Sequence, residues 1–348
     1  MRTKIMSKEN NRNIEGANVR FSRDTVRRIF FRIFNTSGVL PFFLLIAIIV
    51  FTLFSNKFLT LQNLTNVARQ SVYLTLVSLG QMIVLITGGF DLSVGTSIAI
   101  TSVMSSTAMI YAASIFPNMI WAIILVGILA SILSALIIGF LNGVGVSKFQ
   151  VSPFIMTLGV QSIGAGFALF ITGGVPVTGL IPEFGNIFGF GKLFGVPVPV
   201  LFALLAIIIF WFVMNRTKLG TYIYAVGGNI KAANLSGINT KKILLLSYVL
   251  CALLASMAGF LLTARVESGE TNLGATVALE SIAACVIAGV SLRGGIGKVE
   301  NVVLGAFFII MVQNGMNLLQ VGSYMQMILL GSLLILAIIF DRYRFKFS

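Results

Sequence analysis

The side chains that could carry out catalysis or bind a metal are few, and their spacing excludes the common kinds of active site. There is no histidine, and the two cysteines, Cys251 and Cys285, lie far apart inside apolar runs, so neither a disulfide framework nor a Cys/His metal site can be built. The glycine-rich strings at 189–192 and 294–298 lack the spacing and the ending of a nucleotide-binding P-loop. No G-x-S-x-G nucleophile motif is present. We therefore expect a passage or a scaffold, with no catalytic residue and no metal of its own.

Four amides inside apolar runs could hydrogen-bond to a polar solute, because an amide both donates and accepts. Hydrogen bonding between neighbouring helices is an equally good interpretation of such amides. Ionisable groups are nearly missing from the apolar runs, so the chain lacks the relays that proton-coupled carriers use. The four amides, candidates for the translocation path, are Gln81, Gln161, Asn314 and Asn317.

The elements that must position these residues are predicted to be membrane-spanning helices. Hydrophobic residues make up 57% of the chain and charged residues 10%, a composition typical of an all-α polytopic membrane protein. Unbroken apolar runs of close to ~20 residues favour helices over a barrel, and we predict about ten spans. The eighth span is too short for a full crossing, which indicates a broken or re-entrant segment. The predicted spans are 39–55, 71–88, 94–114, 120–141, 153–172, 196–214, 243–264, 279–292, 302–319 and 324–340.

Positive charge predicts the orientation of these spans. The polar segment 215–242 carries five cations and no acid, so it should lie in water on the cytoplasmic side. Residues 1–37 are read as a cytoplasmic basic tail, either an amphipathic helix at the membrane surface or a plain basic flank. A membrane domain at 38–342 and a cytoplasmic end at 343–348 follow. All 24 cations then fall on the cytoplasmic side, beside anionic lipid and without nucleic acid, except Lys57, Arg69, Lys192 and Arg265.

Three cytoplasmic turns could contact a partner. In the loop 215–242, Gly227, Gly228 and Asn229 predict a turn and the start of a short helix that Gly237 ends. Such a helix either packs on its own bundle or enters a groove of a partner. In the turn 86–97, Asp91 is predicted to accept from amides near Ser93 and Val94 as an N-cap, with a gating or contact role as the alternative. The turn 291–301 is read as a tight loop or a docking site, and its glycines are Gly294, Gly295 and Gly297.

Three stretches carry a resemblance to a known family. They are ITGGFDLSVG at 86–95, TKLGTYIYAVGGNIKAANLSGI at 217–238 and ESIAACVIAGVSLRGGIGK at 280–298. From about residue 38 to 342 the chain resembles the sugar permeases of bacterial ABC importers, the branch with the ribose, arabinose, xylose and galactose permeases. The ending at 314–344 looks closest to the arabinose and galactose types. Ala288 stands where members commonly have glycine, and Ser281 follows Glu280 where members often carry aspartate.

The resemblance implies a type II importer-like permease of the bacterial inner membrane. It implies a pair of permease copies, two cytoplasmic ATPases that use the ATP, and a periplasmic sugar-binding protein. Alternatives are a self-sufficient secondary carrier or channel, and an ABC permease for another polar solute such as a furanosyl signalling molecule. The residues that match the family's coupling helix, which contacts the ATPase, lie within the loop 215–242 and are Gly227, Gly228, Asn229, Ala232, Ala233, Ser236, Gly237 and Ile238.

Overall fold

The computed structural model describes residues 40–344, so the predicted tail at 1–37 and residues 345–348 lie outside the described part. In that part the chain is helical apart from one short hairpin, in which β1 (Lys192–Leu193) pairs with β2 (Val196–Pro197). The helices are α2 (Leu40–Phe54), α3 (Leu61–Ile86), α4 (Val94–Ile115), α5 (Ile120–Ser147), α6 (Pro153–Thr172), α7 (Pro182–Phe184), η1 (Gly185–Gly189), α8 (Val198–Arg216), α9 (Lys218–Gly228), α10 (Ile230–Leu235), α11 (Thr240–Val266), α12 (Val277–Ile287), α13 (Val299–Leu318) and α14 (Ser323–Arg344).

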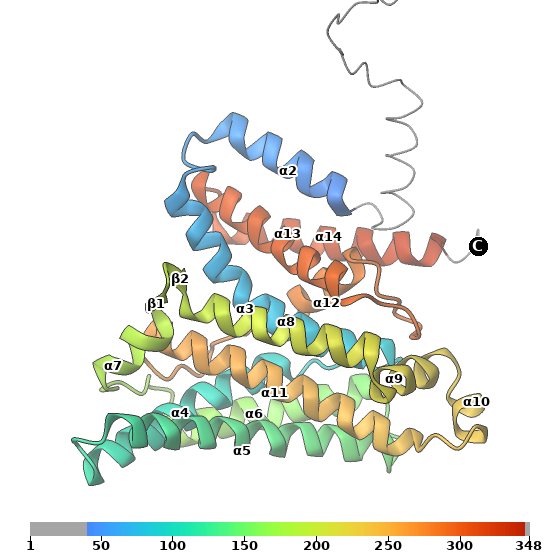
Figure 1. Cartoon of the computed structure of the whole chain (residues 1–348), viewed down its shortest axis with the longest axis horizontal. Helices are drawn as coiled ribbons and strands as arrows, with labels where there is room; N and C mark the ends of the chain where they lie inside the picture. The colour runs from blue at the N-terminus through green and yellow to red at the C-terminus, as the bar shows by residue number, and fades with distance from the viewer. Residues whose placement is uncertain (1–39, 345–348) are drawn as a thin grey trace, which may run out of the picture. The chain divides into compact units, whose positions relative to one another are not determined.

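Long helices make up most of the molecule, as Figure 1 shows, with α9 and α10 at one end, here called the α10 end, and the hairpin at the other, the hairpin end. Among the described residues, 7 helices are long and apolar enough to cross a membrane, namely α3, α4, α5, α6, α8, α11 and α13. The shorter apolar helices α2, α12 and α14 coincide with the remaining predicted spans. The all-helical polytopic fold is therefore confirmed.

The helix that contains the second predicted span begins ten residues before that span. We expected residue 71, but α3 begins at Leu61, after Thr60, whose hydroxyl accepts from the backbone N–H of Asn63 at 3.3 Å. The first turns of α3 carry Gln, Asn and Arg side chains, so hydropathy misses them. The amide of Asn63 is nevertheless buried, because Asn314 of α13 covers it.

Helix α11 lies at the centre of the bundle and packs against α3, α4 and α5. Gly139 and Gly143 of α5 let that helix approach α11 closely, since a Cβ at Gly143 would lie 2.9 Å from the Cα of Leu245. On the α3 side, a Cβ at Gly80 would lie 2.9 Å from the Cα of Cys251. Small residues at these positions let helix backbones meet without large side chains between them.

The predicted eighth crossing contains only the short helix α12, as its short apolar run indicated, and whether it is broken or re-entrant stays a prediction. After α11 the chain turns at Glu267, whose φ is 59°, and continues without helix until α12 begins at Val277. Gly269 pairs with Val177, and the backbone N–H of Glu270 donates to Ser102 Oγ of α4 at 3.0 Å. The first half of this crossing is thus an irregular segment that lies along α4.

Candidate functional site

The loop 215–242 folds into two helices, α9 and α10. The hydroxyl of Thr217 accepts from the N–H of Gly220 at 3.4 Å and begins α9, which we had not predicted. Gly227 and Gly228, expected in a turn, are instead the last residues of that helix. The spacing of the buried Gly220, Ile223 and Val226 was the available signal, but the glycines and polar residues around it obscured the pattern.

The predicted short helix is present as α10. Asn229 caps it by accepting from the N–H of Ala232 at 3.0 Å, and Gly237, with a φ of 82°, follows it in a conformation that favours glycine. Ala233 is buried against the bundle, while Leu235 is 89% exposed. Helix α10 thus rests on the bundle by one face and leaves the other uncovered. Leu235 is absent from the residues that the resemblance suggested, although it is the most exposed apolar side chain of α10.

Three segments that are far apart in the sequence meet at the α10 end. We call this the three-turn junction and define it as Ile86–Gly89, Tyr224–Gly228 and Gly294–Gly297. The N–H of Gly295 donates to Ile86 O at 2.8 Å, and the Tyr224 hydroxyl donates to Gly297 O at 2.8 Å. A Cβ at Gly227 would collide with the carbonyl of Ile86. The end of α9 therefore touches the backbones of both other turns.

Gly294 shows why the third of these segments, Gly294–Gly297, needs glycine. Its φ is 91°, and an added Cβ would lie 2.8 Å from the carbonyl oxygen of Gly227. A larger residue would therefore be strained in its backbone and would also push α9 away. The N–H of Ser291 closes the same turn by donating to Ile296 O at 3.0 Å. The tight loop predicted here is confirmed, and whether it also contacts a partner stays a prediction.

Asp91 is fully buried, so no partner can reach it in this conformation. Its carboxylate accepts from Ser93 N at 2.9 Å, as predicted, and also from Ser93 Oγ at 2.6 Å. Asp91 is not the N-cap of α4, however, because the helix begins at Val94 and Ser93 holds that position. Asn142 of α5 donates to the same hydroxyl at 2.7 Å. With its amide oriented to satisfy both groups, Gln81 donates to Asp91 O at 3.0 Å and accepts from Asp91 N at 3.3 Å. The turn after α3 thus folds back into the bundle, where α3 and α5 hold it.

The amides predicted for the translocation path are not brought together. Asn314 forms a mutual pair with Asn63 of α3, at 2.8 and 3.0 Å, so both of its polar groups are occupied by another helix. Asn317 is exposed and accepts from Gln326 at 2.7 Å. The backbone carbonyl oxygen of Gln161 accepts from Thr96 Oγ1 at 3.0 Å, and the Gln161 side chain takes no part in that bond. A role in solute passage stays a prediction for all four amides, including Gln81.

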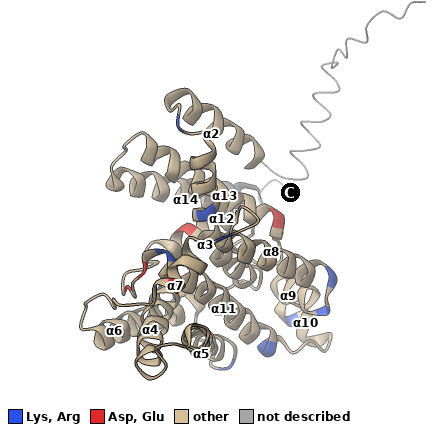
Figure 2. Ribbon diagram, turned by 60° about the vertical axis from the view of Figure 1, so that its left-hand side comes forward, with Lys and Arg blue, Asp and Glu red and all other residues tan. Residues whose placement is uncertain are grey.

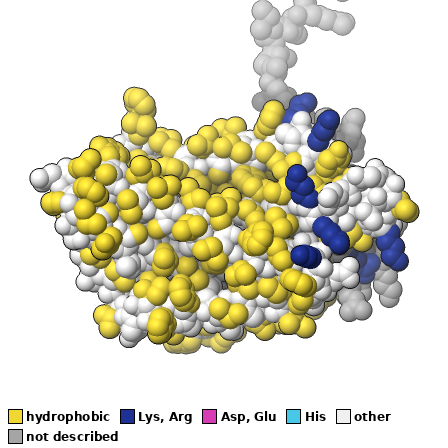
Figure 3. Space-filling view, turned by 90° about the horizontal axis from the view of Figure 1, so that it is seen from below, with side chains coloured by type: hydrophobic (Ala, Val, Ile, Leu, Met, Phe, Trp, Pro, Cys, Tyr) yellow, Lys and Arg dark blue, Asp and Glu magenta, His cyan; other side chains and the backbone are white. Residues whose placement is uncertain are grey.

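Cations gather at the α10 end. In Figure 2 the ribbon is blue at Lys and Arg positions along α9 and α10, and Figure 3 shows dark blue side chains at one end of an otherwise largely hydrophobic face. Arg216 lies over the ring of Trp211 with its guanidinium carbon 5.9 Å from the centroid, and the Trp211 indole donates to Glu300 at 2.5 Å. Burial and the nearby Glu300 carboxylate raise the pKa of Tyr224 above its ordinary 10.0, so its hydroxyl stays a neutral donor to Gly297.

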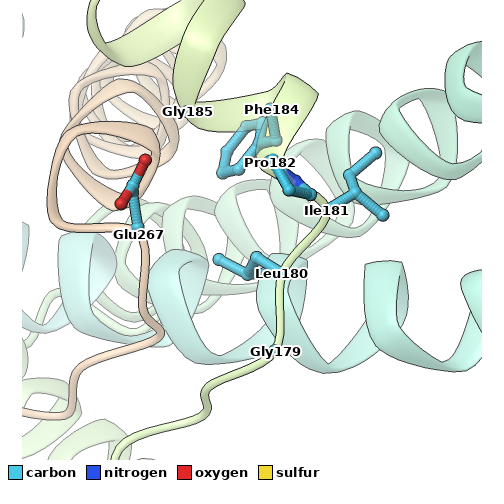
Figure 4. Close-up of a pocket in the computed structure, with 7 residues that line it drawn as sticks. All are labelled: Gly179, Leu180, Ile181, Pro182, Phe184, Gly185 and Glu267. Atoms are coloured by element: carbon cyan, nitrogen blue, oxygen red, sulfur yellow. The ribbon is translucent and has the colours of Figure 1, made fainter.

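A cavity of about 200 Å³ lies at the hairpin end, between the loop after α6 and the end of α11. Figure 4 shows the Glu267 carboxylate pointing toward Gly185 across from Leu180 and Pro182. The lining residues are Gly179, Leu180, Ile181, Pro182, Phe184, Gly185 and Glu267. None of them belongs to the three-turn junction, so the cavity and the coupling residues lie at opposite ends of α11.

A sequence profile described as the permease component of branched-chain amino acid transport systems matches residues 63–338. The chain belongs to this family. Its relatives include the ribose import permease protein of Escherichia coli K12, which is 38% identical over 301 residues, or 86% of this chain and 91% of the relative. The D-allose transport system permease of the same organism is 34% identical, again over 86% of this chain and 90% of the relative. No solved structure matches the chain.

A further relative is also named as an import permease for a sugar. The galactose/methyl galactoside import permease of Haemophilus influenzae is 34% identical over 83% of this chain and 88% of the relative. Over the aligned length the identity to this relative, 34%, is below the 38% to the ribose relative. The resemblance of the ending to the arabinose and galactose types stays a prediction. Family membership and the apolar helices together make this permease a multi-pass membrane protein and a transport component, not an enzyme.

Proposed function

We propose that this permease is the membrane-spanning subunit of an ATP-driven importer that carries a monosaccharide, a pentose or a hexose. The family description names branched-chain amino acids, but the full-length relatives at 34% to 38% identity import ribose, allose and galactose. Those relatives cover most of both chains, so they are the better guide to the solute. A periplasmic binding protein would deliver the sugar, and a separate ATPase would use the ATP.

The proposed orientation puts the α10 end in the cytoplasm. Lys231, Lys241 and Lys242 belong to this end, together with Arg293 and Lys298 beside the three-turn junction. Positively charged segments stay on the cytoplasmic side during insertion. With α2, α12 and α14 counted beside the 7 long helices, the chain crosses about ten times, which leaves both termini in the cytoplasm.

The observation that carries this proposal is the contact of α9 with two other turns. An ATPase that holds α10 through Leu235 would move α9 with it, since Asn229 joins the two helices directly. The end of α9 touches Ile86 and Gly294 backbone to backbone, so little motion would be absorbed by flexible side chains. Closure of a pair of ATPases could in this way bias a pair of permease copies between inward-open and outward-open states.

Reconstitution tests this function directly. The permease is placed in proteoliposomes with its ATPase and binding protein. Uptake of labelled ribose, allose and galactose is measured, and uptake of labelled leucine is measured separately to represent branched-chain amino acids. We expect accumulation of one sugar that requires ATP and both partners. Accumulation by the permease alone under an ion gradient, indifferent to ATP, would instead identify a secondary carrier. Uptake of leucine without any sugar would reject the sugar assignment while leaving the importer intact.

A further inference from the structure

The irregular half of the eighth crossing lies at membrane depth. Its Glu270 backbone contacts Ser102, which is eight residues from the start of α4, or about 12 Å along a helix that is long enough to span the membrane. Its Gly274 packs against Ile98 on the same helix, where an added Cβ would lie 2.9 Å from Ile98 Cβ. Residues 270–274 therefore run beside the first half of α4, from Ser102 back toward its start.

This segment is neither covered nor fully hydrogen-bonded by the rest of the described chain. Asn272, Ala275 and Thr276 are exposed. Within residues 40–344, no hydrogen bond reaches the backbone N–H groups of Thr271, Asn272 and Leu273. Acyl chains offer no acceptor for such groups, and irregular backbone at membrane depth is tolerated only where protein covers it or water meets it. The exposed side of the segment therefore cannot face lipid.

The side chains on this segment suit a hydroxylated solute. Glu270 accepts from Ser268 Oγ at 2.7 Å through one carboxylate oxygen, and Glu280 lies in the first turn of α12. Threonine and asparagine both donate and accept, while the free N–H groups donate. Two carboxylates would repel an anionic solute but accept from neutral hydroxyls. We call the surface formed by Glu270, Thr271, Asn272, Thr276 and Glu280 the polar strip.

The start of α4 meets the irregular segment that precedes α12. A Cβ at Gly95, the second residue of α4, would collide with the carbonyl of Gly274, so the start of α4 touches the segment that precedes α12. The chain before α4 is itself folded back into the bundle beside Gln81. Helix α12 thus begins beside the start of α4, and transporters place solute sites where an interrupted helix begins inside the membrane.

We propose that the polar strip is the solute-binding wall of the translocation path and takes a neutral, polyhydroxylated molecule such as a monosaccharide. This rests on the proposed function, since it names where that sugar is held. It also moves the expected path away from Asn314 and Gln81, whose polar groups are used within the bundle. The strip must then be reachable by water from one side of the membrane in at least one state of the transport cycle.

Cysteine labelling in the complete complex tests this proposal. Asn272→Cys and Thr276→Cys are made separately and treated in membranes with a membrane-impermeant maleimide, first with and then without ATP. Leu205→Cys is the matched control, because Leu205 is 55% exposed but lies on the apolar face of α8. The native Cys251 and Cys285 are buried and set the background. We expect the strip cysteines to react about tenfold faster than the control, since a thiol must reach water to form the thiolate.

Protection by solute separates a binding wall from a merely wet surface. The sugar that the wild-type complex accumulates, among ribose, allose and galactose, should slow labelling of Asn272→Cys when the binding protein is present. Strip cysteines that react no faster than Leu205→Cys would overturn the proposal, because a second copy or lipid would then cover them. Fast labelling that the accumulated sugar leaves unchanged would also overturn it. If the complex accumulates none of the three, the sugar assignment fails, and labelling relative to Leu205→Cys still decides whether the strip faces water.

Discussion

Gly227 and Gly228 form a matched pair that tests the three-turn junction. Both are helical residues at the end of α9, so replacing either by alanine gains roughly 0.5 to 1 kcal/mol from the lower conformational freedom of the unfolded chain. Their surroundings differ completely. A Cβ at Gly227 would collide with Ile86 O and lie 2.7 Å from Gly295 N, whereas a Cβ at Gly228 meets nothing within 4 Å.

The expected magnitudes follow from that difference. Forcing a methyl group against backbone that cannot rotate away costs about 1 to 3 kcal/mol, so Gly227→Ala should be destabilised by about 1 to 2 kcal/mol after the intrinsic gain is subtracted. Gly228→Ala should be unchanged or stabilised by about 0.5 kcal/mol. The two variants should therefore differ by about 2 kcal/mol in the free energy of unfolding, or roughly 30-fold in the equilibrium constant.

The assay is equilibrium unfolding of the purified permease in mixed micelles, followed by tryptophan fluorescence, with the wild type alongside. Each variant is also incorporated into the complete complex, where ATP hydrolysis and sugar uptake are measured separately. For Gly227→Ala we expect hydrolysis to persist while uptake falls, because displaced α9 no longer moves the turns beside it. Equal stability of Gly227→Ala and Gly228→Ala would refute the packing of this junction, and normal uptake by Gly227→Ala would refute its role in coupling.

Three further predictions concern the remaining surfaces. Leu235→Asp should leave stability unchanged but abolish co-purification of the ATPase. The control is Phe194→Asp, which should leave co-purification intact, because Phe194 is 97% exposed in the hairpin at the other end. Equal binding of the ATPase by both variants would contradict docking through α10. Asn314→Leu should lower the free energy of unfolding by about 1 to 3 kcal/mol, because it leaves the buried Asn63 amide unpaired. The double variant Asn63→Leu/Asn314→Leu should recover part of that stability and retain uptake. A stable but inactive double variant would return Asn314 to the translocation path. Lys231→Cys should react with an impermeant maleimide only after cells are permeabilised, and Phe194→Cys should react in intact cells; the reverse pattern would invert the proposed orientation.

The apolar runs predicted the fold well because a helix that crosses hydrocarbon must be apolar over most of its length. Three features escaped for physical reasons. The first turns of α3 are polar yet ordered, since Asn63 is paired with Asn314, 251 residues away in sequence. Helix α9 buries only one narrow face, and its glycines lower its helix propensity. Asp91 looked like a surface cap, and only the contacts with Gln81 and Asn142 show that its turn is buried.

The predicted amides illustrate the same difficulty for the solute path. The sequence does not distinguish a buried Asn or Gln that pairs with another helix from one that faces a solute, so spacing alone cannot separate the two interpretations. For Asn314 the partner lies on α3 and is visible only in three dimensions. The polar strip was hidden for a different reason: all of its residues except Glu280 lie between two predicted spans, where a sequence shows an ordinary loop. The short eighth span was the one signal that pointed to it.

Helix α12 links the proposed solute wall to the proposed motor contact. Its 11 residues, about 16 Å of helix, begin at the polar strip and end shortly before the turn that carries Gly294 and Gly297. Cys285 Sγ donates to Ser78 O at 3.3 Å, and Ala284 packs against Gly305, so α12 is held between α3 and α13. A displacement of α9 would reach this turn through Tyr224 and Gly227, and a short helix packed on two sides would transmit it as a shift of its whole length. The strip would then open or close in step with the ATPase without any ionisable relay, which accounts for a transport chain with so few charges in its spans.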